Sequence, residues 1–175
     1  MTTNSKLMEM LTGYAASHQH PFNIFVHMIG IPTIMLGVFI PLTWVGVEIS
    51  GVTLNLAHVA LLGFFIFYLT LDRTFAFVFL IFAFLIAQFA GYLSGQEAIS
   101  SGAIAAGAFF GGYVAQFIGH AVEKSMPVLV KHPIQANLAA PFFTVVEMFK
   151  IIGLRDDLFN AVQQQIAARR QQDLA

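Results

Sequence analysis

Long apolar stretches are the feature that most constrains the fold of this chain. They recur four times between residues 24 and 122, and each approaches the roughly 20 apolar residues that a membrane-spanning helix requires. Only 10% of the 175 residues are charged, so little polar surface is available to cover these stretches in water. The chain is therefore expected to be an integral membrane protein.

The expected fold is a single all-α membrane domain over residues 1–175, with four transmembrane helices arranged as two hairpins. Pro32 and Pro41 lie inside the first span and are expected to kink it. A tight turn at Asp72 and Arg73 separates the second span from the third. The expected spans cover about residues 24–47, 51–71, 74–93 and 102–122.

Shorter segments on either side of the spans are expected to be interfacial amphipathic helices. Residues 5–17 place apolar side chains at spacings of three and four, as a helix lying on a membrane surface does. Residues 137–175 are expected to form interfacial and cytoplasmic helices. The segment 137–152 is expected to be interfacial or re-entrant, because Pro141, Glu147 and Lys150 argue against a fifth span.

The last expected span carries a small residue at every fourth position. This spacing predicts a ridge on which another helix can pack closely. The ridge consists of Ala103, Gly107, Gly111, Ala115 and Gly119.

The distribution of cationic residues predicts the orientation in the bilayer. With four spans, all eight Lys and Arg residues fall on one side of the membrane. The positive-inside rule then places both termini in the cytoplasm. The expected location is the bacterial inner membrane, or the endoplasmic reticulum in a eukaryote.

Composition also excludes several functional classes. The chain has no cysteine, which rules out thiolate catalysis and Cys-based metal sites. Its formal net charge is −1 and its cations are dispersed, so a nucleic-acid partner is not expected. The oligomeric state does not follow from the sequence.

Histidines and other polar groups gather at the expected cytoplasmic edge, where five of the six histidines fall. Imidazole and carboxylate groups together suit first-row metal ions. The expected metal ligands are His18, His27 and His120, with His20, His132, Asp72 and Glu147 as lesser candidates. Three further residues on the same helix faces, Asn23, Gln116 and Glu123, are expected to orient ligands or substrate, and Glu123 is also a potential ligand.

Spacing in the sequence does not select the metal or the reaction. Two histidines and a carboxylate with open positions would suit Fe(II) and dioxygen, whereas a His-rich zinc site would suit hydrolysis of a lipid. A third possibility is a non-catalytic membrane scaffold or lipid-binding protein, in which the histidines only form hydrogen bonds between helices.

Two ordered motifs resemble the membrane 2-hydroxy-fatty-acid dioxygenase family, whose members act in fatty-acid α-oxidation during phytosphingosine breakdown. Further similarity lies at Asp72, Pro141 and Glu147, so that it covers nearly the whole chain. The first motif comprises Tyr14, His18, Pro21, Asn23, His27, Gly30 and Pro32, and the second comprises Gln116, Gly119, His120, Glu123 and Pro127.

The resemblance implies an Fe(II)-dependent enzyme that removes one carbon from a long-chain 2-hydroxy fatty acid. Dioxygen would be the cosubstrate, and no oxoglutarate would be needed. The acyl chain of the substrate would lie between Phe-lined spans, and Lys124 or Lys131 would hold its carboxylate.

Overall fold

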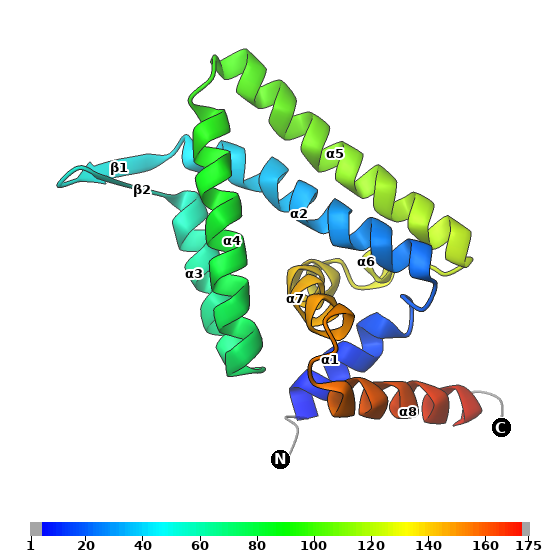
Figure 1. Ribbon diagram of the computed structural model, residues 1–175. Helices are drawn as coiled ribbons and strands as arrows, with labels where there is room; N and C mark the ends of the chain where they lie inside the picture. The colour runs from blue at the N-terminus through cyan, green and yellow to red at the C-terminus, as the bar shows by residue number, and fades with distance from the viewer. Residues whose placement is uncertain (1–4, 173–175) are drawn as a thin grey trace.

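The computed structural model describes residues 5–172 and shows a helical protein with one short β-hairpin (Figure 1). Among the described residues, three helices are long and apolar enough to cross a membrane, namely α2, α4 and most of α5. The elements are α1 (Ser5–Ala15), α2 (Pro21–Thr43), β1 (Gly46–Ile49), β2 (Val52–Asn55), α3 (Leu56–Leu69), α4 (Arg73–Ser94), α5 (Ala98–Glu123), α6 (Val128–Lys131), α7 (Pro133–Ile151) and α8 (Asp156–Gln172).

Helix α2 begins and ends earlier than the predicted first span. Pro21 occupies its first turn, where a missing N–H costs nothing, and the His20 side chain accepts a hydrogen bond from Phe22 N as the N-cap. Pro32 and Pro41 lie inside the helix, as expected. The helix ends at Thr43 rather than at residue 47.

A β-hairpin occupies the end of the first predicted span and the start of the second. Strands β1 and β2 pair in antiparallel register, with Ile49 opposite Val52. Ser50 and Gly51 form the turn with φ values of 52° and 78°, the positive values that a two-residue hairpin of the right twist requires. The Ser-Gly pair between alternating residues was a usable sequence signal for this turn, which the span prediction for residues 51–71 missed.

Helix α3 is consequently too short to be the second predicted span. It has 14 residues, which gives a length of about 21 Å at 1.5 Å per residue, against roughly 30 Å for the hydrocarbon core. The four-span arrangement is therefore not reproduced. The helix pair α7 and α8 is a further candidate for a membrane span. The two helices are long and apolar enough together, but the chain bends by 117° between them.

The long helices do not pair as the two predicted hairpins. Helix α2 packs along α5, and α3 packs along α4, while the consecutive helices α4 and α5 contact each other little (Figure 1). Because α2 and α5 run in opposite directions, the first turns of α2 lie beside the last turns of α5. This antiparallel contact determines where the candidate site forms.

Glycines allow the close approach of α2 and α5, but mostly not those of the predicted ridge. A Cβ on Gly37 would lie 2.5 Å from Phe109 N, and one on Gly112 would lie 2.6 Å from Ile34 Cγ1. Gly107 and Gly111 instead face open space, and of the three glycines in the predicted ridge only Gly119 lies against α2. The face of α5 that packs on α2 is therefore mostly not the face predicted from the repeat of four. Ala105 and Gly112 lie on the face that makes the contact.

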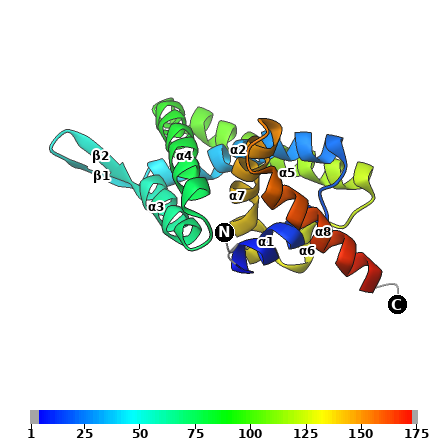
Figure 2. The same cartoon turned by 60° about the horizontal axis from the view of Figure 1, so that its bottom comes forward.

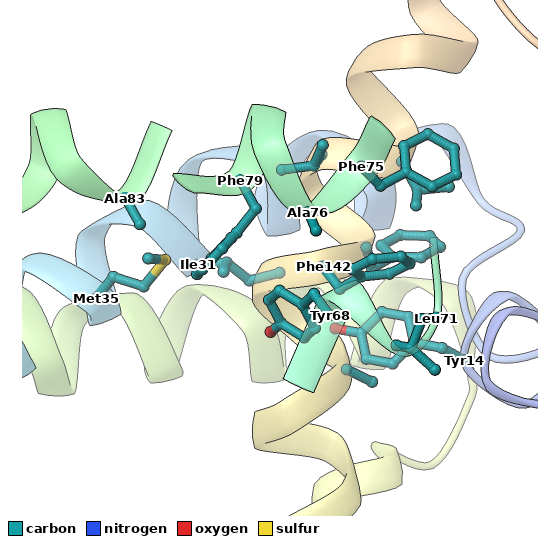
Figure 3. Close-up of a cluster of buried hydrophobic side chains, with 14 of the residues drawn as sticks. Tyr14, Ile31, Met35, Tyr68, Leu71, Phe75, Ala76, Phe79, Ala83 and Phe142 are labelled. Atoms are coloured by element: carbon teal, nitrogen blue, oxygen red, sulfur yellow. The ribbon is translucent and has the colours of Figure 1, made fainter. Parts of the chain in front are cut away.

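The remaining helices cover one end of the long ones (Figure 2). Helix α1 forms within the segment for which an amphipathic helix was predicted, and it packs on α7 and α8. Helix α7 also contacts α2 and α4, and it is buried from Pro141 to Glu147. Its Phe142 joins Tyr68, Phe75 and Phe79 in a fully buried aromatic cluster (Figure 3).

Candidate metal centre

Three histidines from separate segments meet at the junction of α1, α2 and α5. His18 follows α1, His27 lies in the second turn of α2, and His120 lies in the last turn of α5. One ligand atom from each lies within 4.8 Å of the others. All three are buried, with exposed fractions of 2%, 1% and 4%. A single ion could be held by these three side chains.

The Nδ1 atoms of two of these rings face backbone carbonyl groups. His18 Nδ1 donates to Tyr14 O at 2.7 Å, and His27 Nδ1 donates to Asn23 O at 2.9 Å. A carbonyl oxygen only accepts, so each Nδ1 carries the proton and each Nε2 keeps a free lone pair. This is the arrangement that usually orients a metal-binding histidine.

Ser125 has the corresponding role for His120. The Ser125 hydroxyl donates to Ser17 O at 3.3 Å, which leaves its oxygen to accept from His120 Nδ1 at 2.9 Å. Lys124 caps the end of α5 in the left-handed conformation, with φ 57°, and the chain turns Ser125 back toward His120. No distinctive sequence pattern marks Ser125, because its role depends on this turn and on the position of Ser17.

Glu123 connects the loop that carries His18 to helix α2. Its carboxylate accepts hydrogen bonds from Gln19 N at 2.7 Å and from Asn23 Nδ2 at 2.5 Å. Asn23 is fully buried, and its Nδ2 also donates to Ser17 O. Glu123 and Asn23 therefore support the positions of His18 and His27.

Burial keeps His18 neutral. Loss of solvent, and then the neighbouring His27, lower the pKa of His18 to about 2. A neutral imidazole is the form that binds metal. His18 Nε2 is buried and has no hydrogen-bond partner within residues 5–172, which is costly in a protein interior unless another group occupies that position.

Four lesser ligand candidates lie outside this cluster. His20 caps α2 and is exposed, and His132 is also exposed. Asp72 caps α4 and forms an ion pair with Arg155 at 2.7 Å. Glu147 is buried and faces Lys150 at 3.3 Å. Each already has a structural role in capping or pairing, or is turned to solvent.

The donor set of the described residues fits a metal ion held by imidazole. It offers three nitrogen ligands and leaves the remaining positions of an ion open. The two-histidine, one-carboxylate set considered from the sequence does not form among residues 5–172, because no carboxylate joins the cluster. Glu123 binds Gln19 and Asn23 instead.

A cavity adjoins the cluster and is lined by all three histidines. Most of its wall is apolar, with Ile31, Ile34, Met35 and Phe117 from the paired helices α2 and α5. The other polar lining residues are Tyr14, Tyr113, Gln116 and Asn137. Neither Lys124 nor Lys131 is among the lining residues, and the described part of the chain contributes no other Lys or Arg to the wall. An apolar chain with a polar end would match this cavity.

Comparison with known proteins agrees with these features. A family model described as Mpo1-like, 2-hydroxy-palmitic acid dioxygenase Mpo1-like, matches residues 4–151. The matched range contains the three histidines together with Asn23, Glu123 and Ser125. No curated protein and no solved structure gives a significant match.

Proposed function

Because the chain belongs to the 2-hydroxy-palmitic acid dioxygenase Mpo1-like family, we propose that it is an Fe(II)-dependent dioxygenase. Its substrate is a long-chain 2-hydroxy fatty acid, from which it removes one carbon. The observation that carries this proposal is the buried cluster of His18, His27 and His120 at the wall of an apolar cavity.

The reaction balances without a further cosubstrate. The 2-hydroxy acid and one dioxygen yield a fatty acid one carbon shorter, one carbon dioxide and one water. The bond between the carboxyl carbon and C2 breaks, and both carbons are oxidised. Together they supply all four electrons that dioxygen accepts, so no oxoglutarate is required.

The residues of the chain supply binding and orientation. His18, His27 and His120 would hold Fe(II), which supplies the reactivity toward dioxygen when bound. Asn23, Glu123 and Ser125 keep the imidazoles oriented through the hydrogen bonds described above. Gln116 lines the cavity beside His120 and orients the substrate.

The apolar wall of the cavity supports a fatty acyl chain as the other part of the substrate. Ile31, Ile34 and Met35 follow one face of α2 away from the cluster. A chain bound along them would be removed from water, and each buried methylene would contribute about 0.8 kcal/mol. The polar end of the substrate would then lie at the histidines.

The site lies at the cytoplasmic face of the membrane in this proposal. All eight Lys and Arg residues belong to elements at the end of the bundle that carries the cluster, such as α1, α7 and α8. The opposite end, with the β-hairpin and the turn before α5, has Glu48 and Glu97 but no cation. This asymmetry supports cytoplasmic termini.

Metal content and oxygen uptake test the proposal. Protein purified in detergent is loaded with Fe(II) under argon, and air is then admitted with 2-hydroxypalmitate. We expect one iron per chain and one carbon dioxide released per dioxygen consumed. Zinc in place of iron, with no oxygen uptake, would favour a lipid hydrolase. An intact fold that retains no metal would favour a scaffold.

A further inference from the structure

The Tyr14 hydroxyl is a hydrogen-bond donor in the cavity wall that has no acceptor among the described residues. Tyr113, in the same wall, donates to Asn137 Oδ1 at 2.7 Å. Tyr68, in the neighbouring core, donates to Leu138 O at 2.7 Å. No hydrogen bond of this kind joins the Tyr14 hydroxyl to residues 5–172, although the side chain is only 5% exposed.

The ring of Tyr14 is held in place, so its hydroxyl has a defined position relative to the histidines. It stacks on His18 with parallel planes and a centroid separation of 4.1 Å. It also packs on Phe143 with a separation of 4.5 Å. Figure 3 shows Tyr14 reaching from α1 into the core beside Tyr68 and Phe142. Because Tyr14 lines the cavity, a ligand bound there would lie next to this ordered side chain.

The composition of the cavity wall favours a neutral hydrogen-bond donor as the partner of an anionic ligand. A carboxylate buried without hydrogen-bond donors is strongly disfavoured, and the lining residues that the structure describes include no Lys or Arg. A tyrosine hydroxyl is protonated at neutral pH and donates strongly to a carboxylate. In the same wall, Asn137 Oδ1 accepts from Tyr113 and one Asn137 Nδ2 hydrogen is donated to Pro133 O, while the Gln116 amide is a second neutral donor beside Tyr14.

We propose that the Tyr14 hydroxyl binds the carboxylate of the 2-hydroxy fatty acid and so fixes the polar end of the substrate beside His18. This inference rests on the proposed function and adds a substrate-binding residue to it. It assigns to a neutral tyrosine the role that the sequence suggested for Lys124 or Lys131.

The test compares Tyr14→Phe with the matched variant Tyr68→Phe. Each removes one buried hydroxyl and keeps the ring, so Tyr14→Phe retains the stacking on His18. Binding of 2-hydroxypalmitate is measured in nanodiscs on Fe(II)-loaded protein under argon, where no turnover occurs. We expect Tyr14→Phe to raise the Kd roughly 10- to 100-fold, as the loss of a hydrogen bond to a charged group does. Tyr68→Phe should leave the Kd within about twofold of the wild-type value.

A second ligand and the metal content make the result specific. Hexadecane-1,2-diol keeps the 2-hydroxyl group but lacks the carboxylate, so Tyr14→Phe should bind it as the wild type does. Iron content should be equal in all three proteins. An unchanged Kd for 2-hydroxypalmitate, equal weakening by Tyr68→Phe, or loss of iron in Tyr14→Phe would overturn the inference. If the wild-type protein itself does not bind 2-hydroxypalmitate, the proposed function fails as well.

Discussion

The carboxylate of Glu123 accepts a 2.5 Å hydrogen bond from the side-chain amide of Asn23, although the two residues lie 100 positions apart in the chain. This contact joins the end of α5 to the start of α2. It lies beside the cluster, because the Asn23 backbone carbonyl accepts from His27 and the other Glu123 oxygen accepts from Gln19, next to His18. The bond thus links the positions of two histidines.

Replacing Glu123 by Gln should weaken metal binding without removing a ligand. Gln19 N and Asn23 Nδ2 donate to different oxygens of the Glu123 carboxylate, and glutamine replaces one of these acceptors with an NH2 donor, so one of the two hydrogen bonds is lost. Loss of such supporting hydrogen bonds typically reduces metal affinity 10- to 100-fold. Competition with a chelator measures the affinity, and Glu48→Gln in the exposed hairpin is the control. Equal affinities in the two variants would show that Glu123 does not support the centre.

Removing a cluster histidine should abolish metal retention, whereas removing a neighbouring histidine should not. His120→Ala deletes one of three imidazoles, and two nitrogen ligands hold an ion weakly. His132→Ala removes an exposed side chain outside the cluster. Elemental analysis of both purified variants measures the difference. If His120→Ala retained the full metal content, His120 would be excluded as a metal ligand.

The helix contact predicts which glycines tolerate a methyl group. Gly37→Ala would place a Cβ 2.5 Å from the backbone of Phe109, so the helices must separate. Overpacking of this kind costs about 1–3 kcal/mol, and we expect a lower melting temperature in detergent. Gly107→Ala adds a Cβ in open space and should be as stable as the wild type or more so. If Gly107→Ala lowered the melting temperature more than Gly37→Ala, the predicted ridge rather than the observed contact at Gly37 would hold the helices together.

The stability of the metal-free protein should fall as the pH drops below about 6.5. Burial lowers the pKa of His18 to about 2, from an ordinary value of 6.5. The folded state therefore binds fewer protons than the unfolded state between these values, and acid favours unfolding. Thermal unfolding from pH 7.5 to pH 5 measures this slope. The melting temperature of the variant His18→Gln should depend less steeply on pH than that of the wild type. Parallel curves for the two proteins would show that His18 is not the source of the pH dependence.

The orientation in the membrane can be tested with single cysteines, because the chain has none of its own. Glu48→Cys places a thiol in the hairpin, and Gln164→Cys places one on the exposed face of α8. In intact bacterial cells, an impermeant maleimide should label the first variant only. Labelling of the second without lysis would place the C-terminal helix, and the site with it, on the outer side.

The local sequence predicted helices accurately where one pattern, such as an unbroken apolar run, extended over the whole segment. Helix α4 and the end of α5 agree with the predicted spans within a few residues, and α1 agrees at its start. Residues 46–55 were misread because their apolar content resembles a span, whereas their alternation and the Ser50-Gly51 turn favour a hairpin. Average apolarity does not distinguish a lipid-facing helix from an apolar strand.

The sequence by itself determined that the chain is rich in membrane-length apolar segments and that His18, His27 and His120 are the histidines to examine. Both properties follow from residue type and local spacing. The tertiary structure alone decided that these three meet while His20 and His132 do not, that Glu123 supports the cluster, and that Ser125 and Tyr14 face the site. Those relationships depend on the antiparallel packing of α2 on α5 and on the turn at Lys124. Contacts between residues about 100 positions apart arise from such packing, which local spacing does not encode.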